Sequence, residues 1–163
     1  MLAKIRTTLS LLILTVLVGC AAPHRVVGNG SAPIANNGYV LIRVRSDMQG
    51  ILPLKPASFW GTPFLLGVGG DKHYLLSMKP GTYSLGALMV DMKFGWDTFD
   101  TTPFKVEPGK VAYLGQHHFY RKPRSMYSWN VRDTLEESLA GLSSTSLAEI
   151  RNLPIERHIP INK

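Results

Sequence analysis

Hydrophobic and polar residues alternate with a period of two in the segment that follows Gly38. In residues 39–45, three β-branched residues alternate with Leu41, Arg43 and Arg45. This period is typical of a strand with one face on a core, so we expect the arginines to point outward. Similar strand-like runs follow at residues 64–66, 73–78, 83–90, 102–106, 111–120 and 126–131.

Two Pro-Gly pairs separate neighbouring runs. Pro80-Gly81 and Pro108-Gly109 each stand between strand-like residues. Proline presets φ at the second position of a turn and glycine supplies a positive φ at the third, so both pairs predict type II turns. Each turn is expected to close a hairpin, and short strands with regular turns favour an antiparallel sandwich.

Two other segments are predicted to lie outside the strands. Residues 47–56 are expected to form a loop. The glycine-rich residues 67–71 are expected to form a hairpin turn. A phosphate-binding loop is the alternative for these glycines, but it requires a following helix, and a strand-like run follows instead.

After residue 131 the hydrophobic period changes to that of helices. Asp133 and Glu136 have the spacing of a capping box, and leucines at positions 135, 139 and 142 share one helical face. A second short helix is predicted for residues 144–152, ended by Pro154. We expect these helices to cover a face of the sheet; docking of a partner is the alternative.

The first twenty residues have the pattern of an export signal. Lys4 and Arg6 precede an apolar run over residues 9–18, which is shorter than the roughly 20 residues that a membrane span needs. The run ends in Leu17-Val18-Gly19-Cys20, which resembles the bacterial lipobox. The resemblance implies cleavage after Gly19 and lipid attachment at Cys20, and two or more acyl chains hold a protein stably on a membrane. The alternatives are an ordinary signal peptide with a chance cysteine and an uncleaved amphipathic start.

The lipobox resemblance also implies a location. Alanine follows Cys20 where an aspartate would resemble an inner-membrane retention signal, so in a host with two membranes the outer membrane, facing the periplasm, is favoured. The predicted organisation is a signal peptide over residues 1–19, a lipidated flexible tether over 20–37, a β-sandwich over 38–131 and C-terminal helices over 132–163.

The net charge of the whole chain is +7. Removing Lys4 and Arg6 with the signal leaves 16 basic and 11 acidic side chains, or +5. Near a membrane such a surface suits anionic headgroups or acidic glycans rather than nucleic acid. A solvated surface without a partner is the alternative.

The two Pro-Gly segments carry a second resemblance. Residues 78–85 and 104–115 are similar to segments of the carboxypeptidase-regulatory-like, or transthyretin-like, β-sandwich of bacterial lipoproteins. The resemblance implies a mainly β fold of seven or eight antiparallel strands, of transthyretin or immunoglobulin type, here with one or two short C-terminal α-helices. It brings no catalytic residues and no cofactor.

Two loops are candidate contact sites. Phe94, Trp96 and Phe99 lie close together in a turn-rich stretch, which indicates either a recognition loop or a lid on the sandwich. A basic loop carries Arg121, Lys122 and Arg124, which are candidates for contact with an anionic surface; a solvated hairpin loop is the alternative.

The histidines do not predict a metal site. His117 and His118 are adjacent in a predicted strand, so they point to opposite faces, one toward the core and one toward the surface. A zinc site needs further ligands, and His73 is the only other histidine within the predicted strands.

No enzyme motif is recognisable, neither a nucleophile elbow nor a zinc-peptidase or dinucleotide signature. The sequence therefore favours a membrane-anchored envelope lipoprotein that acts as a non-enzymatic binding or scaffolding module. The alternatives are an accessory lipoprotein of a secretion- or conjugation-type machine and a small hydrolase.

Overall fold

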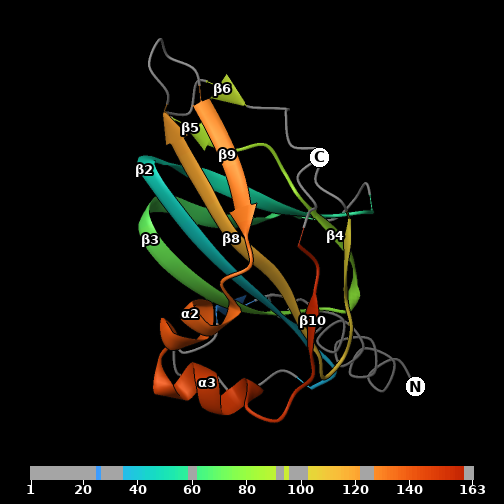
Figure 1. The fold of residues 1–163 in the computed structure, drawn as a ribbon. Coiled ribbons are helices and arrows are strands. Elements are labelled where there is room, and N and C mark those ends of the chain that lie inside the picture. The colour runs from blue at the N-terminus through green and yellow to red at the C-terminus, as the bar shows by residue number, and fades with distance from the viewer. Residues whose placement is uncertain are drawn as a thin grey trace, which may run out of the picture.

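The computed structural model of the 163-residue chain describes residues 25–26, 35–58, 62–90, 94–95, 103–121 and 127–159. The strands are β1 (Arg25–Val26), β2 (Gly38–Pro56), β3 (Phe64–Met78), β4 (Gly81–Leu85), β5 (Met89–Val90), β6 (Phe94–Gly95), β7 (Phe104–Val106), β8 (Val111–Arg121), β9 (Tyr127–Arg132) and β10 (Ile155–Arg157), and the helices are α2 (Leu135–Ala140) and α3 (Ser144–Ile150). Within the described residues these ten strands form one sheet (Figure 1). The prediction of a mainly β fold with two short helices near the C-terminus is confirmed.

Strand β2 is the centre of the sheet. It pairs with β3 along nearly all its length. On its other edge, residues 39–46 pair with β8, whereas residues 50–51 pair with β5 and residues 54–56 with β4. Because different strands flank the two halves of β2, the sheet curls and its halves enclose a core (Figure 1).

The sheet is mixed rather than antiparallel throughout. β2 and β8 pair in parallel, as do β8 and β10. The two expected hairpins do not form ladders: β4 pairs with β2 and β7, and β8 pairs with β2, β9 and β10. The predicted Pro-Gly turns therefore link strands on different parts of the sheet, which a local turn motif does not reveal.

Only one of the two Pro-Gly turns has the expected glycine conformation. Gly109 has a φ of 67°, and the Lys110 N–H lies 3.3 Å from the Glu107 carbonyl oxygen, as a four-residue turn requires. Gly81 begins β4 and is not among the described glycines with positive φ, so the predicted type II turn at Pro80-Gly81 is wrong.

The predicted loop at residues 47–56 and the predicted turn at 67–71 are both wrong, because these segments continue β2 and β3. Leu52 and Leu54 point into the core and are almost fully buried, which favours continued strand pairing. Between the pairs Ser46–Gly70 and Gly50–Val68, three residues of β2 lie opposite Gly69 alone. This is an irregular bulge. Gly69 has a positive φ of 142° because it lies in this bulge and not in a hairpin turn.

The two faces of β2 pack against different partners. Val40, Ile42 and Val44 are fully buried in the core enclosed by the curled sheet. Leu41 is also fully buried, on the opposite face, in a second cluster that includes Ile150 of α3. The helices thus cover one end of the outer face of the sheet, as predicted (Figure 1).

Part of the predicted flexible tether is ordered against the sheet. Arg25 and Val26 form β1, paired with Ser77 and Leu76 of β3. On the other side of β3, Ser77 pairs with Tyr39 and Leu76 pairs with Val40, near the start of β2. Residues 25–26 and residues 35–37 therefore both lie at the end of the sheet where β2 begins.

Candidate functional site

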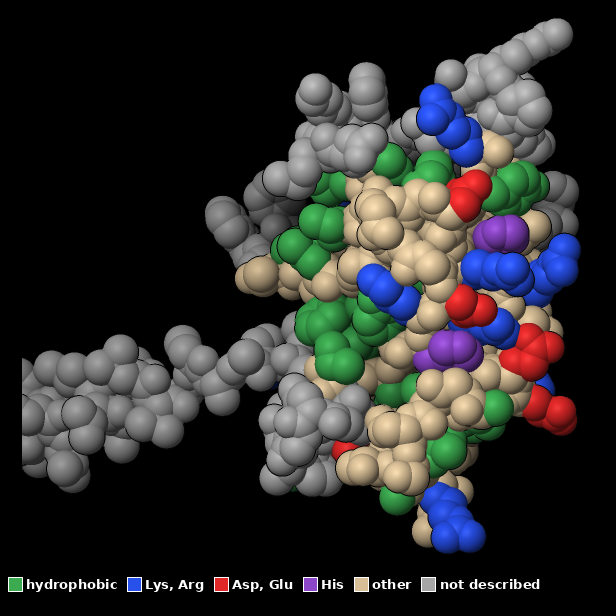
Figure 2. Space-filling view, turned by 90° about the vertical axis from the view of Figure 1, so that its left-hand side faces the viewer, with side chains coloured by type: hydrophobic (Ala, Val, Ile, Leu, Met, Phe, Trp, Pro, Cys, Tyr) green, Lys and Arg blue, Asp and Glu red, His purple; other side chains and the backbone are tan. Residues whose placement is uncertain are grey.

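The outer face of the sheet that the helices leave open carries charged and imidazole side chains. Figure 2 shows these side chains gathered on the right-hand half of the view. Register partners in neighbouring strands share one face of a sheet, and the register defines two adjacent rows. Across β3, β2, β8 and β9 the rows are His73, Arg43, Gln116 and Arg132, then Asp71, Arg45, His118 and Asn130.

Arg43 is held by two carboxylates. Its Nε and Nη2 donate to the two oxygens of Asp71 at 2.9 and 2.7 Å, and its Nη1 donates to Glu137 of α2 at 2.6 Å. The bond from Arg43 is the largest influence that holds the pKa of Asp71 below its usual value. The Arg43 side chain thus fastens α2 to the sheet.

His73 completes this contact with α2. Its Nδ1 lies 3.1 Å from the carbonyl oxygen of Ser138, its Nε2 lies 3.7 Å from Asp71, and its ring packs against Gly141 at the end of α2. The ring approaches the backbone carbonyl of Ser138 and not its hydroxyl. These three side chains therefore do not have the geometry of a Ser-His-Asp triad.

Each row contains an arginine that binds no carboxylate of the described residues: Arg132 in the first row and Arg45 in the second. Arg45 and Arg132 are exposed, and neither makes an ion pair within the described part of the chain. His118 lies on β8, the strand between those of the two arginines; it is the register partner of Arg45, and it contacts the Tyr120 ring with a centroid separation of 5.1 Å. Partial burial, with smaller contributions from Arg45 and Arg132, lowers the pKa of His118 despite the nearby Asp47.

His117 points to the opposite face, so the predicted division of the two histidines is confirmed. Its side chain has 0% exposure. Nε2 lies 3.0 Å from the Leu114 carbonyl oxygen, and Nδ1 accepts from Trp129 Nε1 at 3.1 Å. Burial lowers the pKa of His117 to about 4, so this ring is neutral at pH 7.

Most residues singled out from the sequence lie outside the described part of the chain; these are Gly19, Cys20, Trp96, Phe99, Lys122 and Arg124. Phe94 lies in β6, but its side chain is not described. Arg121 is exposed at the end of β8, with its N–H 3.5 Å from an Asp47 oxygen. Arg121, the member of this group whose side chain is described, does not belong to either row.

The rows themselves were only partly visible in the sequence. Alternation predicts that Arg43 and Arg45 point outward, and this is confirmed. The neighbours His118 and Arg132 were missed as a group, because nothing local in the sequence indicates that β2 and β8 pair in parallel.

A separate apolar hollow lies between the helices and β10. Its volume is about 420 Å³, within the range of small-ligand pockets. The lining residues are Leu139, Ser144, Leu147, Ala148, Ile150, Arg151, Leu153 and Ile155. The hollow lies over the helical layer, away from the polar rows.

Among the residues the structure describes, no group of three or more His, Cys, Asp or Glu side chains is placed to hold a metal ion. None of the helices described is long and apolar enough to cross a membrane. No protein-family model matches the chain, and no curated protein sequence matches it.

Proposed function

We propose that the protein is an envelope lipoprotein, anchored by lipid on Cys20, whose β domain is a non-enzymatic binding module. In this proposal the partner is bound by the open polar face of the sheet and the adjoining end that carries Arg121. One observation carries the proposal: Arg121, at the end of β8, lies far along the sheet from β1 and the start of β2, where the chain enters the domain.

The entry point is defined by β1 and by the start of β2. Arg25 pairs with Ser77, and Ser77 pairs with Tyr39, so both segments lie at one end of the sheet. Arg25 is the fifth residue after Cys20, and an extended chain over these five steps spans at most about 18 Å. An acylated Cys20 would therefore keep this end close to the bilayer.

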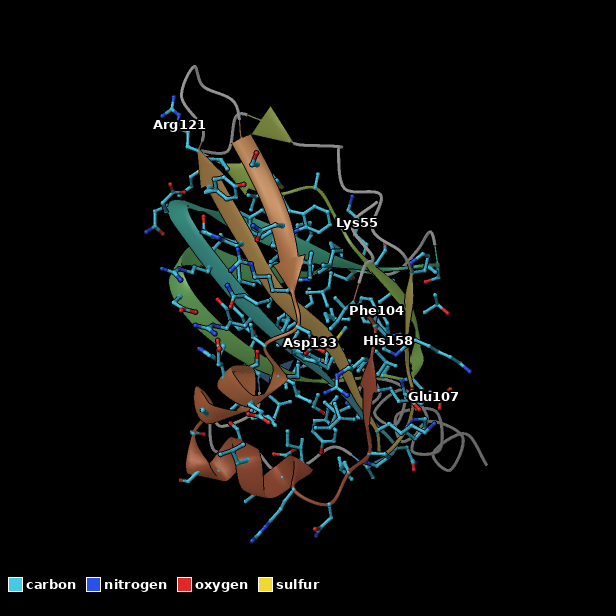
Figure 3. All side chains as sticks on the ribbon, viewed as in Figure 1. Lys55, Phe104, Glu107, Arg121, Asp133 and His158 are labelled. Atoms are coloured by element: carbon cyan, nitrogen blue, oxygen red, sulfur yellow. The ribbon has the colours of Figure 1, made fainter. Side chains whose placement is uncertain are left out.

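The other end of the domain lies well away from the entry point. Tyr39 is the register partner of Val111, and Arg121 follows ten residues later in β8, which corresponds to about 33 Å of strand. Figure 3 labels Arg121 near the top of the view and Glu107 at its lower right. Gly109, two residues after Glu107, donates to the carbonyl of Asn37 at 3.1 Å, so Glu107 lies near the start of β2. This arrangement favours a partner reached from the membrane over the membrane itself.

Mass spectrometry of the protein recovered from membranes of its own cells tests the anchor. We expect a mature chain that begins at residue 20, with a thioether-linked lipid and an acylated amino group. Metabolic labelling with a palmitate analogue should be lost in Cys20→Ala and kept in a Ser31→Ala control. A free thiol at residue 20 would remove the anchor from the proposal.

An accessory role in a larger envelope machine is the second candidate within the same proposal. The polar face supports it as well, because its side chains come from four adjacent strands, β3, β2, β8 and β9. Crosslinking in intact cells separates the two: a stoichiometric protein complex favours the machine, and its absence favours a smaller ligand.

The resemblance to transthyretin-like sandwiches belongs to this proposal as well. What supports it is a core enclosed between the two halves of a β-sheet, as in a sandwich. The parallel pairing of β2 with β8 departs from the antiparallel arrangement that the resemblance implies.

A further inference from the structure

Two arginines on the same strand have different environments. Arg43 forms ion pairs with both Asp71 and Glu137, and its side chain is only 14% exposed. Arg45, two residues later on the same face, is exposed and has no carboxylate within ion-pair distance among the described residues. Its register partner Asp71 already binds Arg43 with both oxygens.

We propose that Arg45, His118 and Arg132 form a binding site for one oxyanion group, a phosphate or a carboxylate, on a ligand. This inference rests on the proposed function as a binding module and names the chemistry that the module recognises. The three side chains come from three adjacent strands, β2, β8 and β9, so the sheet holds their backbones in a fixed relation.

The residue types suit an oxyanion. An arginine presents a planar fork of N–H donors that matches the two oxygens of a carboxylate or phosphate. Two such forks flank an imidazole that gains a proton when an anion approaches. Asn130, the register partner of His118, has a buried side-chain oxygen without a hydrogen-bond partner among the described residues.

The charged groups around His118 set the direction of the pH dependence. Arg45 and Asp47 face it from β2, Asp71 from β3 and Arg132 from β9. Asp71 is neutralised by Arg43, which leaves Asp47 as the main competing carboxylate. Binding of an anion therefore raises the pKa of His118, and binding should tighten as the pH falls through that pKa.

The position of the site indicates whether the oxyanion comes from a lipid headgroup of the anchoring membrane or from another ligand. Arg45 lies six residues beyond Tyr39, about 20 Å along β2 from the end where the chain enters. Lipid headgroups of the membrane that holds the anchor are thus distant. We infer that the oxyanion belongs to a ligand outside that bilayer.

Titration of the full mature protein in neutral detergent with inorganic sulfate or phosphate, at constant ionic strength, tests the site. The readout is the imidazole NMR signal of His118. We expect saturable shifts, an increased pKa of His118 in sulfate, and roughly tenfold weaker binding in Arg45→Gln and in Arg132→Gln. Arg151→Gln removes the same charge at the helical end and should bind as the wild type does.

Each other outcome counts against the site. A shift that rises linearly with salt, or equal binding by Arg45→Gln and Arg151→Gln, would overturn it. A response to vesicles of anionic lipid without any response to free phosphate would assign the surface to membranes instead. Unchanged signals of buried His117 in every variant establish that the fold is intact. Because lipid on Cys20 is measured separately by mass, loss of this site leaves the anchor untouched.

Discussion

The buried imidazole of His117 is hydrogen-bonded to the backbone carbonyl of Leu114, three residues earlier in the same strand, with 3.0 Å between Nε2 and the oxygen. Between them Gly115 has a φ of 85°, and the pairing of β2 with β8 shifts register at this point. His117 therefore bonds to a backbone carbonyl at the bulge. Trp129 donates to the other ring nitrogen, so both nitrogens of a neutral imidazole are used.

This arrangement predicts that acid destabilises the protein through His117. The pKa of His117 is about 4 in the folded protein, below the unfolded value of about 6.5, so the unfolded chain binds more protons between these pH values. The stabilisation is complete above pH 6.5 and is lost as the pH falls toward 4, by about 3 kcal/mol in total. Urea unfolding at pH 7, 5.5 and 4.5 measures it.

His117→Gln supplies the control, because glutamine keeps one donor and one acceptor but does not titrate. The variant should be less stable at pH 7 and should show a shallower decline in its free energy of unfolding over this range. Equal slopes for the variant and the wild type would show that His117 does not carry the acid sensitivity.

A second prediction concerns Gly115. A Cβ there would lie 2.9 Å from the Arg132 carbonyl oxygen, on a backbone that L-residues rarely adopt. We expect Gly115→Ala to lower the free energy of unfolding by about 2–4 kcal/mol. Gly109→Ala separates strain from collision, since Gly109 has a positive φ but no atom within 4 Å of its added Cβ. That variant should lose about 1 kcal/mol, and equal losses would disprove the role of the collision.

A third prediction concerns the attachment of α2. The buried hydroxyl of Tyr113 accepts a bond from the N–H of Thr134 at 2.9 Å, just before the helix begins. Tyr113→Phe leaves that N–H without its partner and should cost about 1–2 kcal/mol. Faster hydrogen exchange at the Ser138 amide, which bonds to the Thr134 carbonyl, would locate the loss in α2.

Tyr74→Phe is the matched control for this change. The Tyr74 hydroxyl donates to the Gly67 carbonyl at an exposed position, where water replaces a lost bond. We expect little change in unfolding free energy and none in the exchange of the Ser138 amide. A loss of similar size in both variants would mean that the Tyr113 bond has no special part in holding the helix.

The sequence predicts those features that depend on neighbouring residues. The alternation in residues 39–45, the opposite faces of His117 and His118, and the two short helices all follow from local periodicity. Features that depend on residues far apart in the chain cannot be predicted from local periodicity. Residues 47–56 contain two prolines, yet they remain in a strand because Leu52 and Leu54 are buried by other parts of the sheet. The polar rows cannot be predicted for the same reason, since Arg45 and His118 become neighbours only through the parallel pairing of two strands far apart in the chain.

The last prediction concerns the orientation of the domain on the membrane. Gly38 at the start of β2 pairs with Met78, so the exposed Lys79 marks the end where the chain enters, and Arg121 marks the other end. Because the only cysteine of the chain is the proposed lipid site, Lys79→Cys and Arg121→Cys each introduce one free thiol for a fluorescent label. In vesicles that carry a lipid-attached quencher, we expect strong quenching at position 79 and weak quenching at 121, because the short connection from Cys20 reaches only the first end. The wild type should take no label if Cys20 is acylated. Stronger quenching at 121 would place the basic end on the bilayer, and the polar face would then be a membrane-binding surface.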